Sequence, residues 1–285
     1  MSSIVTDQGI LHYESIGRGR PIILLHGWIN SWNVWRDQMI DLAQTEKYRV
    51  YALDFWGFGD SAKRTQTTIT TFQIDSYVEM VHQFMDSLGI VRAPIIGHSM
   101  GGTVALQMSL CYPKRVTKVA IVGSPIVGKS LNPFLKMAGN GSIAKLIWHY
   151  PIILDSIMRI LLARDTKKVR RMIFNDVKRT TMESFFRSIG DLRETDLRTR
   201  LPQLTLPTLG IFGTKDNIVS PSNAFFLENG VSGVKVEMMQ NSRHFPMTDE
   251  PEKFLKVISH FLSDAPMSTT IKEQSVNQST VGERT

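Results

Sequence analysis

Cysteine is nearly absent from this sequence, because Cys111 is the only one among 285 residues. A single cysteine excludes an intrachain disulfide framework and is typical of a reducing compartment. The start of the chain, residues 1–7, has neither a basic segment nor an apolar core of the kind found in secretory signals. We therefore expect a cytoplasmic protein, with Cys111 as a buried and inert thiol in a helix.

Long apolar stretches are also missing. The most apolar region, residues 143–163, is interrupted by Lys145, His149, Asp155 and Arg159. A bilayer-spanning helix needs about 20 consecutive apolar residues, so we predict no transmembrane segment.

Motifs for metals and nucleotides are absent as well. The sequence has no His-Glu-x-x-His motif and no paired Cys/His spacing, so no metal is expected. The run Asp54–Ser61 contains two glycines but lacks the third glycine of a dinucleotide loop and any Gly-Lys-Ser/Thr, which favours a structural turn. The basic run Lys167–Arg171 has no interleaved aromatic residues, so we predict no nucleic-acid binding. No cofactor is predicted.

The remaining composition is that of a globular domain, with 42% hydrophobic and 21% charged residues. Short β-branched runs alternate with amphipathic helical stretches, which indicates an α/β fold with a mainly parallel sheet flanked by helices. The predicted strands are Ile10–Tyr13, Pro21–Leu25, Tyr48–Leu53, Pro94–Gly97, Val116–Val122, Thr208–Phe212 and Val234–Met239. The predicted helices of this core are Trp32–Ala43, Thr71–Leu88, Met100–Tyr112 and Pro251–Leu262.

The alternation stops after Ser124 and resumes at Thr208. The intervening residues 125–207 have helical periodicity and no convincing strand, so we predict a helical cap inserted into a core made of residues 1–124 and 208–265. Residues 266–285 are rich in Ser, Thr, Gln and Asn, which predicts a disordered tail.

The net charge of +7 belongs to the predicted cap. Residues 125–207 contain 15 Lys and Arg but 7 Asp and Glu, whereas the rest of the chain is nearly neutral. A basic surface of this kind attracts an anionic substrate or an anionic membrane. The alternative is that the basic side chains are simply solvated and the apolar ones pack the cap on the core.

A catalytic serine is indicated by the run Gly97-His98-Ser99-Met100-Gly101, which follows a predicted strand and precedes a predicted helix. A serine with glycines two residues away on each side at a strand-to-helix turn is the nucleophile elbow. The turn places Ser99 at a helix N-terminus, where free N–H groups favour developing negative charge.

Two further residues complete a catalytic set. A serine hydroxyl needs a base, and the base needs a carboxylate that fixes its tautomer. Asp216 follows the predicted strand Thr208–Phe212, and His244 follows the predicted strand Val234–Met239. Because the carboxyl ends of parallel strands meet at one edge of a sheet, we predict that Ser99, Asp216 and His244 form a triad.

The reaction also needs two N–H donors for the oxyanion. We expect the amide of Met100, directly after the nucleophile, to supply one. The apolar strand Ile22–Leu25 ends in a His26-Gly27-Trp28 turn, and the Trp28 amide is the natural second donor.

These motifs together resemble the α/β-hydrolase family over about residues 4–265. The resemblance rests on His26-Gly27-Trp28, Asp54-x-x-Gly57-x-Gly59-x-Ser61, the elbow at 97–102, Gly213–Asp216 and His244. It implies the α/β-hydrolase fold, with Ser99 as nucleophile, His244 as base, Asp216 as acid and the Trp28 and Met100 amides as the oxyanion hole.

Within that family, the elbow is most similar to serine carboxylesterases and cofactor-free haloperoxidase-like esterases. A serine at position 99 argues against the branches that attack with aspartate, and the elbow differs from the Gly-Asn-Ser form of ring-cleavage hydrolases. Arg243 stands where many relatives have glycine. Its side chain either faces solvent or contacts an anionic substrate.

We therefore predict a hydrolase that cleaves carboxylic esters or thioesters of small or acyl-chain substrates through an acyl-enzyme. The alternatives are a ligand-binding receptor or signalling protein on the same fold, and a C–C bond hydrolase, lyase or perhydrolase that uses the same triad. A weak association of the basic cap with anionic membrane surfaces is a further hypothesis. The oligomeric state is not predicted.

Overall fold

The computed structural model describes residues 2–61 and 71–263. Its centre is an eight-stranded sheet with the order β1-β2-β4-β3-β5-β6-β7-β8. The strands are β1 (Ser2–Thr6), β2 (Gly9–Gly17), β3 (Arg20–Leu25), β4 (Tyr48–Leu53), β5 (Ala93–His98), β6 (Val116–Val122), β7 (Thr208–Gly213) and β8 (Lys235–Met239). The pairs β1–β2 and β2–β4 are antiparallel, and all other neighbours in the sheet are parallel. The predicted fold class is confirmed.

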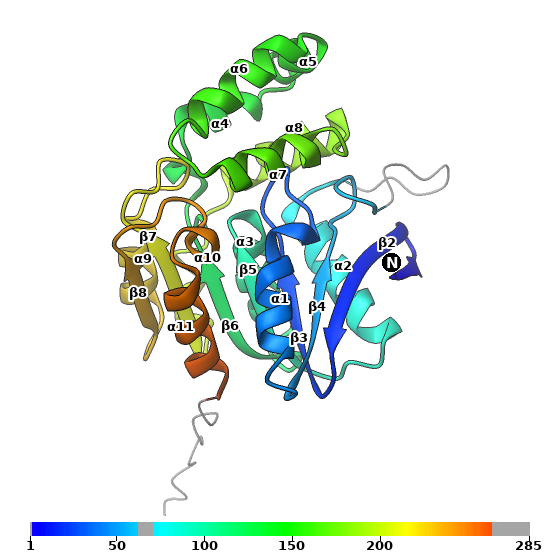
Figure 1. Cartoon of the computed structure of the whole chain (residues 1–285), viewed down its shortest axis with the longest axis vertical. Helices are drawn as coiled ribbons and strands as arrows, with labels where there is room; N and C mark the ends of the chain where they lie inside the picture. Colours follow the sequence, from blue (N-terminus) through cyan, green and yellow to red (C-terminus); the bar gives the residue numbers. More distant parts are fainter. Residues whose placement is uncertain (1, 62–70, 264–285) are drawn as a thin grey trace, which may run out of the picture.

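Helices surround this sheet. They are α1 (Arg36–Ala43), α2 (Ile74–Ser87), α3 (Met100–Cys111), α4 (Pro133–Ala138), α5 (Gly141–His149), α6 (Pro151–Leu161), α7 (Lys167–Val177), α8 (Met182–Glu194), α9 (Asn223–Gly230), α10 (Pro246–Asp249) and α11 (Pro251–Ser263). Short 3-10 turns are η1 (Trp32–Trp35), η2 (Gly128–Ser130) and η3 (Leu201–Gln203). In Figure 1, α1 and α11 lie in front of the sheet, and α2 and α3 lie behind it.

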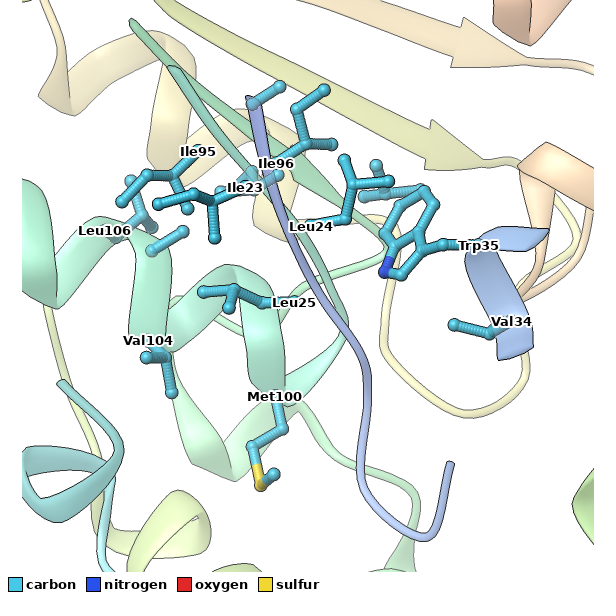
Figure 2. Packing of buried hydrophobic residues seen from close by; sticks show 14 of the residues in the cluster. Ile23, Leu24, Leu25, Val34, Trp35, Ile95, Ile96, Met100, Val104 and Leu106 are labelled. Carbon is cyan, nitrogen blue, oxygen red and sulfur yellow. The ribbon is translucent and has the colours of Figure 1, made fainter. Parts of the chain in front are cut away.

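The core lies between the sheet and these helices. Strand β3 is apolar at every inner position because both of its faces are covered. Figure 2 shows Leu24 directed toward Trp35 of η1, whereas Ile23 and Leu25 lie on the side of Leu106 in α3. This alternation along one strand is the period of two that joins both helical layers to the sheet.

Strand β1 was not predicted from the sequence. Its residues alternate between half-buried and exposed, and it pairs only with β2, antiparallel, at the edge of the sheet. Serine and threonine at three of its five positions give it no apolar pattern, so its pairing depends on the backbone of β2.

The expectation of a buried Cys111 is wrong, because Cys111 is exposed. It is the last residue of α3 and lies on the same side of the helix as the half-buried Gln107, one turn earlier. The predicted disordered tail, residues 266–285, lies outside the described residues. Within residues 2–61 and 71–263, no helix combines the length and apolar character that crossing a membrane requires.

Helices α4 to α8 all lie between β6 and β7, the stretch predicted as a cap, and we call residues 125–207 the cap. Figure 1 shows them as a group at one end of the sheet, with α5 and α6 outermost. Two isolated bridges, Val127 with Asp196 and Leu131 with Val219, are the extended pairings at its base.

Hydrogen bonds join the cap to the core. The Trp28 indole Nε1–H donates to the Phe185 carbonyl at 2.8 Å, and the Ser31 hydroxyl donates to Asp176 Oδ1 at 3.0 Å. The Ser184 hydroxyl donates to the Gly57 carbonyl at 2.8 Å. The turn Asp54–Ser61 therefore supports the cap, in agreement with its interpretation as a structural turn.

Candidate active site

Ser99 lies at the sharp turn between β5 and α3. Its backbone has φ 52° and ψ −121°, a conformation that side chains rarely adopt, and its N–H donates to the Val122 carbonyl at 2.8 Å. Backbone strain of this kind costs about 1–3 kcal/mol and persists only where the surroundings hold it. The turn is held here by β6 on one side and by the first turn of α3 on the other.

The flanking glycines are required by close packing. A Cβ on Gly97 would lie 2.1 Å from the Gly101 carbonyl oxygen, and a Cβ on Gly101 would lie 2.5 Å from the Leu25 carbonyl oxygen. Both distances are far shorter than a real contact. The absence of these two side chains lets α3 begin directly against β3 and β5, which presents Ser99 at the edge of the sheet.

Asp216 and His244 meet at the same edge. Asp216 follows β7 and His244 follows β8, and the His244 Nδ1–H donates to Asp216 Oδ2 at 2.8 Å. The other carboxylate oxygen, Oδ1, accepts from the backbone N–H groups of Ile218 at 2.8 Å and Val219 at 3.0 Å. Asp216 is thus held on both oxygens. This pairing assigns the imidazole proton to Nδ1 and leaves Nε2 as a proton acceptor.

Ser99 and His244 line one cavity of about 50 Å³ beneath the cap. Among the hydrogen bonds of the described residues, none joins the Ser99 hydroxyl to the imidazole. Catalytic hydrogen bonds are often long without substrate and shorten when it binds. In this structure the Ser99 hydroxyl and the imidazole therefore share a cavity without a direct hydrogen bond.

The two amides expected at the oxyanion hole are unengaged. Neither the Trp28 N–H nor the Met100 N–H donates a hydrogen bond to another described residue. Met100 is the first residue of α3, so its N–H belongs to the free donors of a helix N-terminus. Trp28 lies three residues beyond the end of β3 and lines the same cavity as Ser99.

The Trp28 side chain has a second role. Besides its hydrogen bond to the Phe185 carbonyl, its ring lies 4.5 Å from the Phe185 ring, centroid to centroid. Phe185 belongs to α8 of the cap. One residue therefore lines the Ser99 cavity and joins the core to the cap.

His98 contacts the base, which the sequence did not predict. Its Nε2–H donates to the His244 carbonyl at 2.8 Å, and the two rings lie 4.8 Å apart. Burial holds the pKa of His98 well below its ordinary value, and the neighbouring His244 lowers it further. His98 is thus a neutral imidazole that positions the His244 backbone. The two residues are 146 positions apart, and no sequence motif indicates the contact.

His26 is also neutral and structural. Burial lowers its pKa, its Nδ1–H donates to the Gly27 carbonyl at 2.7 Å, and its Nε2 accepts from the Phe55 N–H at 2.9 Å. These bonds tie the Trp28 loop to the turn that follows β4.

Arg243 does not line the Ser99 cavity, so its side chain is not part of the cavity wall. Its backbone N–H donates to Asp249 Oδ2 at 2.8 Å, which fixes the start of the loop that carries His244. A second buried carboxylate, Asp165 of the cap, lies near this loop. Burial raises its pKa, while the charges of His244 and Arg243 oppose that shift.

A group of possible metal ligands lies elsewhere, at His12, Asp54 and Asp60. Asp54 Oδ2 already accepts from His12 Nδ1 at 2.8 Å and from the Asp60 N–H at 2.9 Å, and Oδ1 accepts from the Trp32 N–H at 2.7 Å. These atoms hold the turn after β4 by hydrogen bonds among themselves.

Comparisons with known proteins agree with this arrangement. A family model described as the alpha/beta hydrolase fold matches residues 20–251. The chain is 26% identical to a pimeloyl-[acyl-carrier protein] methyl ester esterase of Aeromonas hydrophila, over 87% of this chain and 98% of that protein. An esterase from Exiguobacterium antarcticum has a similar structure, with a TM-score of 0.79 and 24% identity over 91% of this chain and 98% of the other.

A meta-cleavage product hydrolase from Pseudomonas fluorescens is also similar, with a TM-score of 0.73 and 22% identity over 92% of this chain and 97% of the other. The family match covers most of the chain, and the sheet and the elbow have the form described above. The protein is therefore a hydrolase that belongs to the α/β-hydrolase family.

Proposed function

We propose that this protein is a serine hydrolase that cleaves carboxylic esters or thioesters through an acyl-enzyme. The observation that carries the proposal is the His244–Asp216 hydrogen bond at 2.8 Å, at the same cavity as a serine in an elbow conformation. A nucleophile, a base and an oriented carboxylate are the three parts that acyl transfer by serine requires.

Each residue has one role in the proposed reaction. His244 Nε2 accepts the proton of the Ser99 hydroxyl as Oγ attacks the carbonyl carbon. The Trp28 and Met100 amides donate to the oxyanion, and Asp216 stabilises the imidazolium. His244 then gives the proton to the departing alcohol or thiol. In the second half of the reaction His244 accepts a proton from water as the water attacks the acyl-enzyme, the carboxylic acid is released, and Ser99 regains its proton. This route requires no cofactor.

An acyl group fits the walls of the cavity. Apart from Asn30, Ser99, His244 and the Trp28 indole, its lining is aliphatic and aromatic. The aliphatic lining consists of Ile29, Leu131, Leu135, Met158, Leu161, Leu162, Ile173, Ile189, Leu192 and Ile218. Such a wall favours a hydrocarbon chain and places few polar groups where they would orient a polar substrate. The similarity to the pimeloyl-[acyl-carrier protein] methyl ester esterase, which extends over 98% of that protein, supports an ester as the bond that is cleaved.

The proposal is tested with a panel of p-nitrophenyl esters and acyl thioesters of increasing chain length. We expect Ser99→Ala to lower kcat/KM by about 10⁴-fold or more, because the nucleophile is lost. Ser222→Ala, on an exposed serine outside the cavity, is the matched control. Turnover retained in Ser99→Ala would refute the proposal. Tight retention of the ligand without turnover in the wild type would favour a receptor instead.

A further inference from the structure

The outer surface of the cap has an unusual concentration of exposed apolar side chains. Six of the eleven large hydrophobic side chains exposed in the described part of the chain lie between residues 134 and 160. They are Phe134, Met137, Tyr150, Ile152, Ile153 and Ile160. We call these six residues the outer cap face. Of the other five, Val5 and Ile10 form one cross-strand pair of β1 and β2, and Ile40, Val91 and Phe225 belong to separate segments, so the cap has the largest group of exposed apolar side chains among the described residues.

Helix α6 accounts for the most exposed of them. Ile152 is 82% exposed and Ile160 is 67% exposed, and the spacing of eight residues puts both on one side of the helix. The opposite side, with Leu154, Ile157 and Met158, lines cavities beneath the cap. A helix that is apolar on both sides is normally buried on both sides. In Figure 1, however, α6 is one of the two outermost elements of the molecule.

Positive charge surrounds the outer cap face. Residues 133–164 contain Lys136, Lys145, Arg159 and Arg164 but one acidic residue, Asp155, which pairs with Arg159. The four basic residues at 167–171 belong to α7 instead, where Lys167, Lys168 and Arg171 line a groove against the core. Apolar side chains within a basic surface are the pattern of proteins that lie on anionic membranes. A second copy of this chain would bring like charges together, which disfavours a symmetric dimer through this face.

The outer cap face also connects to the interior. A second, narrow cavity of about 20 Å³ is lined by Phe134, Ala138, Leu154 and Ile157, together with residues that also line the Ser99 cavity: Trp28, Leu135, Met158 and Leu161. The two cavities therefore share walls. Phe134 belongs both to the second cavity and to the exposed surface, so this cavity lies between the outer cap face and Ser99.

We propose that the outer cap face docks on an anionic lipid bilayer and that a long acyl chain passes from it toward Ser99 by displacing the side chains that narrow the second cavity to about 20 Å³. The docking inference rests only on the exposed apolar side chains of the outer cap face and the basic side chains near them. The acyl-chain part rests on the proposed function and specifies its substrate class, a long-chain acyl lipid. Insertion of Ile152 and Ile160 into the acyl region of the bilayer supplies the apolar part of the binding free energy, and the basic side chains bind the lipid headgroups.

Docking is tested by co-sedimentation of the full chain with vesicles of phosphatidylcholine alone and of phosphatidylcholine with phosphatidylglycerol. The Ser99→Ala variant is used, so the result does not depend on turnover. We expect binding to the anionic vesicles that weakens as salt is raised. The double variant Ile152→Ser/Ile160→Ser should lower the partition coefficient about tenfold or more, because two exposed isoleucines no longer enter the acyl region.

The matched control is Val91→Ser/Phe225→Ser, which removes two apolar side chains of similar exposure, 76% and 62%, outside the cap. It should bind as the parent does. Equal binding by both double variants, or no preference for anionic vesicles, would overturn the docking inference. So would a dimer in sedimentation-velocity runs that dissociates only in the Ile152→Ser/Ile160→Ser variant, because the face would then bind a second copy.

The acyl-chain part is tested in active protein with Ile157→Trp, which fills the second cavity, and with Ile157→Leu as the volume-conserving control. The ratio of kcat/KM for long-chain to short-chain esters should fall about tenfold in Ile157→Trp and stay near the wild-type ratio in Ile157→Leu. An unchanged ratio in Ile157→Trp would refute the passage while leaving ester hydrolysis by Ser99 intact. Loss of the proposed function itself would appear separately, as turnover in Ser99→Ala.

Discussion

Asp176 of α7 offers a quantitative test of how the cap is held on the core. The residue is 4% exposed, its Oδ1 accepts the Ser31 hydroxyl at 3.0 Å, and its Oδ2 has no hydrogen-bond partner among the described residues. Burial raises the pKa of this carboxyl to about 7, from a reference of 3.8, and the nearby charge of Asp54 acts in the same direction. We consider the variant Asp176→Asn, which keeps the shape and cannot ionise.

The sign follows from the raised pKa. Between pH 4 and pH 7 the folded protein keeps the proton of Asp176, whereas the unfolded chain releases it. The free energy of unfolding therefore falls as the pH rises through this window, by about 1.4 kcal/mol per pH unit. The full loss approaches about 4 kcal/mol above pH 7, and about 3 kcal/mol of it falls between pH 5 and pH 8. Asp176→Asn removes this pH dependence.

The measurement is urea unfolding of wild type and Asp176→Asn at pH 5 and pH 8. We expect the variant to gain stability relative to the wild type by about 3 kcal/mol from the lower to the higher pH. Glu228→Gln, at an exposed carboxylate of α9, is the control and should show no such gain. A difference between Asp176→Asn and wild type that is the same at both pH values would refute the reasoning, since the proton of Asp176 would then not be retained on folding.

Two further predictions concern the active site. Asp216→Asn should leave the fold intact and lower kcat by about 10⁴-fold, because the amide no longer fixes the His244 tautomer; circular dichroism with ester turnover checks this, and activity near the wild-type level would contradict the assignment. Gly97→Ala should prevent folding or lower the melting temperature sharply, because its Cβ would lie 2.1 Å from the Gly101 carbonyl oxygen. Thermal unfolding tests this, with Gly89→Ala as a control at a glycine that has open space around it but positive φ, where a smaller loss is expected.

Much of the site could be predicted because its signals are local. The glycines two residues before and two residues after Ser99 indicate a tight turn. The apolar runs just before Asp216 and His244 indicate the ends of two strands. A parallel sheet then places such ends at one edge whatever the details of packing. The structure places Asp216 and His244 in direct contact and both Ser99 and His244 at one cavity.

Other parts depend on contacts between distant segments. The bond from His98 to the His244 carbonyl and the bond from Trp28 to the Phe185 carbonyl join residues that are 146 and 157 positions apart. A single residue type in a sequence does not reveal its partner at that distance. The same holds for Cys111, whose exposure depends on which side of the last turn of α3 the rest of the fold covers.

Sequence patterns alone were enough to predict the α/β class, the insertion of a helical stretch between two strands, and the three side chains of the candidate triad. These follow from hydrophobic periodicity and turn chemistry, which act over a few residues. Two features emerge from the folded chain instead: the apolar residues of α6 divide into a buried side and an exposed side, and Asp176 is enclosed with one carboxylate oxygen lacking a hydrogen-bond partner among the described residues. Both depend on how the cap packs against the core, where burial is a property of the assembled fold and of no single segment.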